Sequence, residues 1–172
     1  MAAVIASLGA YAAAFMAVLL LASAGHKLIS KARMREAVMA LTGVPAWAAM
    51  GVLAAAAVVE AGVTLALLLP ATRFVAALAA AGLWGAYLVL ILRAGRAVDC
   101  GCTFGGRAKA STAAQGGRNV GLVAMALLAA AAARVSPPPG IDLLYGVAAL
   151  GLFALYLALD QLSALTSPGA VT

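Results

Sequence analysis

The hydrophobic pattern of this chain consists of long apolar runs separated by short polar stretches. A helix needs about 20 mostly apolar residues to cross the hydrocarbon core of a bilayer. The runs that approach or exceed this length are Leu8–Leu28, Ala46–Leu69, Phe74–Leu92, Asn119–Ala133 and Ile141–Leu159. We therefore predict an all-α polytopic membrane helix bundle, with four core transmembrane helices and a fifth span near the C-terminus.

A different pattern lies between the first two runs, in the segment Ser30–Thr42. Its apolar residues recur every third or fourth position, and they are Ala32, Met34, Ala37, Val38 and Leu41. This spacing predicts a short amphipathic helix on the membrane surface. Gly43-Val44-Pro45 should end it, because proline disfavours helical geometry in the residue before it.

The composition favours a membrane protein over a soluble one. Hydrophobic residues make up 66% of the chain and charged residues 9%, whereas soluble domains carry about 25% charged residues. A soluble fold of 172 residues could not cover so much apolar surface. We expect one membrane domain over residues 1–172, in the cell (inner) membrane. The first span is expected to be retained, because no basic segment precedes it.

Positive charge is concentrated in two loops, and the formal net charge is +6. The two clusters are Lys27, Lys31, Arg33 and Arg35 after the first span, and Arg93, Arg96, Arg107, Lys109 and Arg118 after the third. Cytoplasmic loops carry such an excess of Lys and Arg. Both loops are therefore expected to face the cytoplasm, with the N-terminus outside. The charge is not continuous, which argues against nucleic-acid binding.

Cys100-Gly101-Cys102 contains the two cysteines of the chain and lies in the second basic loop. Positive charge, here from Arg96, favours the reactive thiolate, although Asp99 opposes it. Cysteines one residue apart can form a disulfide only in a bent conformation, so the bond would be strained and easily reduced. The pair therefore indicates thiol–disulfide exchange. The alternatives are binding of a soft ion such as Cu(I) and a pair without chemical role.

Glu60 lies near the middle of the second span. An ionisable group at that depth is costly and is a functional hypothesis by default. It could accept a proton in thiol chemistry. The favoured alternative is that it is the ion-pair partner of Lys27 or Arg118 from another helix.

Other polar residues mark the ends of spans. His26 and Lys27 close the first span, where anchoring at the membrane interface is the simplest role. Arg118 and Asn119 open the fourth span. Asn119 is expected to cap that helix or to form an interhelical hydrogen bond, and Arg118 is expected near the cysteine loop. Asp160 is expected to be a boundary charge at the end of the fifth span.

In their order along the chain, these features resemble the MauE branch of the DoxX-like membrane proteins, the methylamine-utilisation family. The matching features are Ala24-Gly25-His26-Lys27-Leu28, Pro45, Glu60, Asp99-Cys100-Gly101-Cys102 with Phe104-Gly105, and Arg118-Asn119. The similarity covers roughly residues 11–134. The family pattern continues directly from the second cysteine to Phe-Gly, whereas Thr103 is inserted here.

This family is associated with maturation of methylamine dehydrogenase, whose small subunit has many disulfides, and with a thioredoxin-like partner. The resemblance implies a membrane redox component whose Cys100 and Cys102 exchange disulfides with a thioredoxin-fold protein. A relay between two cysteine pairs is impossible with a single pair. The pair must therefore react with both the electron donor and the acceptor, or pass its electrons to a membrane quinone.

The resemblance and the charge count disagree about the side of the cysteine loop. Disulfides of exported proteins form outside the cytoplasm, whereas the charge count places the loop inside. Either the basic cluster serves the thiols and misleads the charge rule, or the pair serves a cytoplasmic thiol partner. Two other functions stay open: a non-enzymatic assembly subunit with the cysteine loop as a docking element, and a small-molecule or metal transporter using Glu60.

Overall fold

The computed structural model describes residues 2–95, 111–134 and 142–165. Its helices are α1 (Ala2–Ile29), α2 (Lys31–Thr42), α3 (Ala46–Leu68), α4 (Arg73–Ala94), α5 (Thr112–Ala132) and α6 (Asp142–Leu165). No strand occurs in the described ranges, and α1, α3, α4 and α6 are long and apolar enough to cross a membrane. The prediction of a multi-pass helical membrane bundle is confirmed.

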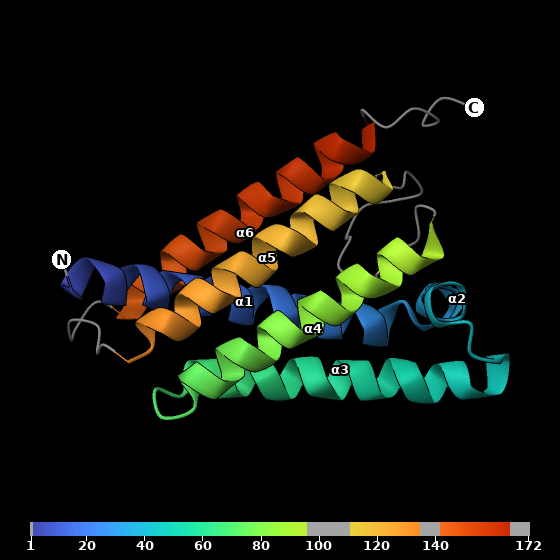
Figure 1. Cartoon of the computed structure of the whole chain (residues 1–172), viewed down its shortest axis with the longest axis horizontal. Coiled ribbons are helices and arrows are strands. Elements are labelled where there is room, and N and C mark those ends of the chain that lie inside the picture. Colours follow the sequence, from blue (N-terminus) through green and yellow to red (C-terminus); the bar gives the residue numbers. More distant parts are fainter. Residues whose placement is uncertain (1, 96–110, 135–141, 166–172) are drawn as a thin grey trace.

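The first helix lies at the centre of the bundle (Figure 1). It packs against α3 on one side and against α5 and α6 on the other, while α4 packs against both α5 and α3. Consecutive long helices run antiparallel, and the short turn at 69–72 joins α3 to α4. The core between them consists largely of alanine, with Met16, Leu19, Leu20 and Trp84 as its largest buried side chains. Small residues allow helix backbones to approach closely in lipid.

The amphipathic helix predicted from Ser30–Thr42 is α2. Met34 and Ala37 are buried against Leu53 of α3, so the apolar face covers the bundle as the spacing indicates. Gly43 ends the helix with a positive φ of 72°, and its N–H donates to the Met39 carbonyl. Glycine adopts this left-handed conformation without the steric penalty of a Cβ atom.

The start of α5 differs from the prediction, which began the fourth span at Asn119. The helix begins at Thr112, because the Ser111 side chain caps it by accepting a hydrogen bond from the Ala114 N–H. Asn119 therefore does not cap this helix. The polar residues in the first turns of α5 also explain why it is not among the four helices that are apolar enough to cross a membrane. The helix α6, which corresponds to the predicted fifth span, is among them.

The two ends of the bundle carry different charge. The C-terminal end of α4 lies at the same end as α2 (Figure 1), which places Arg93 with the basic residues of α2, Lys31, Arg33 and Arg35. Arg73 begins α4 at the opposite end. The fold thus gathers described residues of both basic clusters at one end.

Gly9 allows α1 and α5 to pack closely. A Cβ atom added at Gly9 would lie 2.3 Å from the Cβ atom of Ala132. We expect Gly9→Ala to lower the free energy of unfolding by about 1–3 kcal/mol, because the two helices would have to separate. Denaturant titration of the protein in mild detergent measures this change. Gly25→Ala on the same helix is the control, since its Cβ atom would meet nothing within 4 Å. Equal stability of the two variants would contradict the prediction.

Candidate functional site

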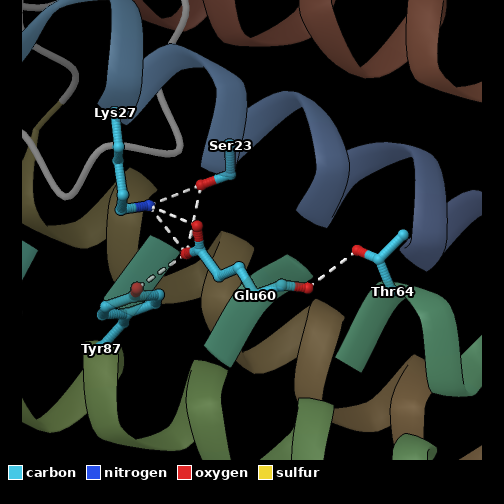
Figure 2. A network of polar contacts seen from close by, with 5 residues as sticks. All are labelled: Ser23, Lys27, Glu60, Thr64 and Tyr87. Atoms are coloured by element: carbon cyan, nitrogen blue, oxygen red, sulfur yellow. Dashed lines mark hydrogen bonds and ion pairs between the residues drawn. The ribbon is translucent and has the colours of Figure 1, made fainter. Parts of the chain in front are cut away.

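Side chains from three helices form a buried polar network (Figure 2). Lys27 comes from α1, Glu60 from α3 and Tyr87 from α4. The Lys27 Nζ atom lies 2.7 Å from Glu60 Oε1 and 2.9 Å from Oε2. The Tyr87 hydroxyl donates to the same Oε1 atom at 2.7 Å. Glu60 has no exposed surface and Lys27 is 3% exposed, so the ion pair is shielded from solvent and lipid.

Ser23 of α1 and Thr64 of α3 complete this network. Ser23 lies one turn before Lys27, accepts a hydrogen bond from its Nζ at 2.7 Å and donates to Glu60 Oε1 at 3.3 Å. The ammonium has three N–H donors, and Ser23 with the two carboxylate oxygens occupies all three. Thr64 donates to the Glu60 backbone carbonyl at 2.8 Å.

This network contains the ion pair that one interpretation of Glu60 expects. The carboxylate pairs with Lys27, as the ion-pair interpretation expects, and not with Arg118. The prediction that Lys27 anchors the bundle at the membrane interface is wrong, because its side chain is buried. The Lys27 side chain extends toward Ser23 and Glu60, so its ammonium does not reach the membrane interface (Figure 2).

A second ion pair joins α5 to α6. Arg118 Nη1 lies 2.9 Å from Asp160 Oδ1, and the Arg118 guanidinium lies 5.9 Å from the centre of the Tyr156 ring. Asp160 is therefore a largely buried interhelical partner, and its prediction as a boundary charge is wrong. The helix α6 extends beyond the predicted end of the span, which brings Asp160 inside the helix rather than to its end.

Asn119 lies one turn after Gln115 on the buried face of α5. Its Nδ2 atom donates to the Gln115 carbonyl at 2.9 Å, so this bond stays within one helix and is not the expected interhelical one. Within the described part of the chain, Gln115 Oε1 and Asn119 Oδ1 are buried without a hydrogen-bond partner.

His26 is partly exposed, and its Nε2 atom contacts the Arg33 guanidinium of α2. This position at the junction of α1 and α2 agrees with a role at the membrane interface. Cys100, Cys102 and Asp99 lie outside the described residues. The helices that flank them, α4 and α5, pack closely against each other. Among the described residues, no group of three His, Cys, Asp or Glu side chains could hold a metal ion.

Sequence reasoning missed Ser23, Thr64, Tyr87 and Gln115. Ser23 carries a weak signal, since it lies four positions before Lys27 and therefore shares its helix face. Tyr87 carries another, because a tyrosine hydroxyl inside an apolar span needs a hydrogen-bond partner. Neither signal identifies Glu60 as that partner.

A small apolar cavity borders the network. It measures about 70 Å³ and lies between α2, α3 and α4, with Met34, Leu53 and Leu90 in its walls and Lys27 and Tyr87 beside them. The hydrogen bonds of Lys27 and Tyr87 point away to Ser23 and Glu60, so the cavity offers apolar contact to a ligand rather than a free donor.

The model of the family described as methylamine utilisation protein MauE matches residues 5–133. No match was found among curated proteins or among solved structures.

Breaking the Lys27–Glu60 pair from either side should strongly destabilise the protein. We expect Glu60→Gln and Lys27→Met each to lower the free energy of unfolding by about 3–5 kcal/mol, because each leaves one buried charge without its partner. The double variant should recover part of this loss, since neither charge then remains. Denaturant titration in detergent measures all three. Additive losses in the double variant would show that the two side chains are not coupled.

Proposed function

This chain belongs to the methylamine utilisation protein MauE family, and on that basis we propose that it is a membrane thiol–disulfide redox component acting through Cys100 and Cys102. The observation that carries the proposal is the Cys-Gly-Cys sequence itself. Both cysteines of the chain lie in it, one residue apart, between Asp99 and a basic stretch. Two lone cysteines placed in this way are suited to making and breaking a strained bond.

The proposed reaction has two steps, a disulfide exchange with a partner and the reoxidation of the cysteine pair. A thiolate of a reduced thioredoxin-fold partner attacks the Cys100–Cys102 disulfide, and a mixed disulfide forms between the two proteins. The second thiol of the partner then resolves it, which leaves the partner oxidised and both cysteines of this chain as thiols. This exchange would support the maturation of disulfide-containing proteins.

The second step returns the cysteine pair to its oxidised form. The two thiols lose two electrons and two protons and form the disulfide, while a membrane quinone accepts both and becomes a quinol. The number of cysteines supports this step. The chain has two, so it contains no second pair that could accept the electrons from Cys100 and Cys102.

The described scaffold is compatible with this role. The loop between α4 and α5 connects two helices that pack against each other along their length (Figure 1), so its two ends are held at fixed positions. It joins the bundle at the basic end, near Arg93 and α2. We place the protein in the cell (inner) membrane with this basic end in the cytoplasm, in accordance with the positive-inside rule. The thioredoxin-fold partner would then be a cytoplasmic thiol protein, and its link to disulfides formed outside the cytoplasm would be indirect.

The geometry around Glu60 does not favour a transport function. Its carboxylate is fully buried and accepts hydrogen bonds from Ser23, Lys27 and Tyr87. A residue held in this way serves better to connect three helices than to bind and release an ion. We therefore assign Glu60 a structural role that supports the redox site.

Removing one cysteine should trap the exchange partner. We expect one of the variants Cys100→Ala and Cys102→Ala to accumulate a mixed disulfide with a thioredoxin-fold protein, because the resolving thiol is missing. Non-reducing electrophoresis followed by mass spectrometry of the trapped band identifies it. The double variant is the control and should trap nothing. Exchange is the wrong idea if neither single variant captures a protein while thiol labelling shows a permanently reduced pair. Full function with serine at both positions would favour the assembly-subunit alternative.

Quinone should oxidise the reduced cysteine pair directly. Purified protein, reduced and freed of reductant, should lose two thiols for each quinol formed when a short-chain ubiquinone is added without oxygen. Thiol titration and quinol absorbance measure both products. The Cys100→Ala, Cys102→Ala double variant should form no quinol. Loss of thiols at the same rate with and without quinone would exclude this acceptor.

A further inference from the structure

A larger cavity lies at the end of the bundle where α3 ends and α4 begins. It measures about 270 Å³, whereas one water needs about 10–15 Å³ of such space. Alanines of α1, among them Ala13, form one wall, and Leu67 of α3 and Gly146 of α6 form others. Arg73 and Tyr145 supply its polar side chains. The space exists because small residues stand where larger ones would fill it.

Arg73 brings a positive charge to this cavity. Its Nε atom donates to the Leu67 carbonyl at 3.3 Å. Among the described residues the guanidinium forms no ion pair, and its terminal nitrogen atoms have no hydrogen-bond partner. The side chain is only partly exposed, and these donors are open to a ligand in the cavity. A second cation, Arg134, lies nearby over the ring of Phe74, 5.2 Å from its centre.

We propose that this cavity binds one anionic phospholipid, with its phosphate on Arg73 and an acyl chain along the alanine wall. A guanidinium presents two parallel N–H donors that match phosphate oxygens. The cavity lies at the end of two apolar spans, the depth at which lipid headgroups meet the hydrocarbon core. Tyr145 donates to Ser7 at 3.2 Å, and tyrosine is common at this depth. An apolar wall beside a cation fits an amphiphile better than a free anion.

The position of the cavity separates it from the proposed redox chemistry. The helix α4 runs from Arg73 to Ala94 over 22 residues, and at 1.5 Å per residue it is about 33 Å long. The cysteine loop follows the far end of that helix. The lipid site is built from residues at the opposite end of α4 and uses no residue of the cysteine loop, so it stands independently of the proposed function.

Competition between two lipids tests this site. The protein is purified in detergent, stripped of lipid, and titrated with equal amounts of phosphatidylglycerol and phosphatidylcholine, with binding read by native mass spectrometry. We expect the natural sequence to retain one phosphatidylglycerol with about tenfold preference. Arg73→Gln should reduce this preference to about one, because the phosphate loses its cation, and Arg73→Lys should retain part of it.

Filling the cavity provides a variant that keeps the charge. A Cβ atom at Gly146 would meet nothing within 4 Å, so Gly146→Leu can enter the empty space and should abolish binding of both lipids. The matched controls are Gly151→Leu, whose Cβ atom on the same helix also meets nothing within 4 Å, and Arg93→Gln, an exposed arginine at the other end of α4. Both controls should bind phosphatidylglycerol as the natural sequence does.

Several outcomes would overturn the proposal. These are equal binding of the two lipids by the natural sequence, a preserved preference in Arg73→Gln, and unchanged binding in Gly146→Leu. Displacement of the lipid by glycerol 3-phosphate would show that the anion alone is recognised. Its displacement by an equal concentration of a short-chain quinone would assign the cavity to that class of ligand. If Arg73→Gln fails to fold, the comparison of Gly146→Leu with Gly151→Leu decides whether the cavity binds the lipid.

Discussion

An ammonium and a carboxylate that meet inside a helical membrane bundle cannot separate without leaving a charge in a medium that solvates it poorly. Lys27 and Glu60 are held in this way, with Tyr87 and Ser23 completing their hydrogen bonds. The pair fixes how α1 and α3 align along their length, and Tyr87 extends the constraint to α4. The helix α5 packs on α1 and α4, and α6 packs on α1. The relative positions of all these helices therefore depend on the Lys27–Glu60 contact.

Lipid cannot supply the hydrophobic force that aligns helices in water, so close packing and polar contacts must do so. In this chain close packing and polar contacts have different roles. Alanine and glycine bring the backbones together, as at Gly9 and Ala132. Two ion pairs then set the alignment, Lys27–Glu60 for α1 with α3 and Arg118–Asp160 for α5 with α6. A slide of one helix by a turn would preserve much of the alanine packing but would break these pairs.

The ends of the bundle are specialised in different ways. The basic end carries α2 and the connection between α4 and α5, in which the cysteines lie. The other end carries the cavity beside Arg73. With the ion-paired centre between them, this arrangement is compatible with the proposed thiol chemistry in the loop at one end and the proposed lipid site at the other. A rigid scaffold for a reactive loop is a common arrangement of functional residues.

The sequence by itself determined the helices, because apolar length and periodicity are local properties of the chain. It located α2 from its three-to-four spacing, and it marked Glu60, Lys27 and Arg118 as charges that require an explanation. It placed the start of α5 too late, because the prediction relied on apolar residues and the first turns of this helix are polar. The tertiary structure alone decided the partners. Glu60 could have paired with Lys27 or Arg118, and Asp160 could have stayed at the surface, since these choices depend on which helix faces meet across gaps of 33 and 42 residues.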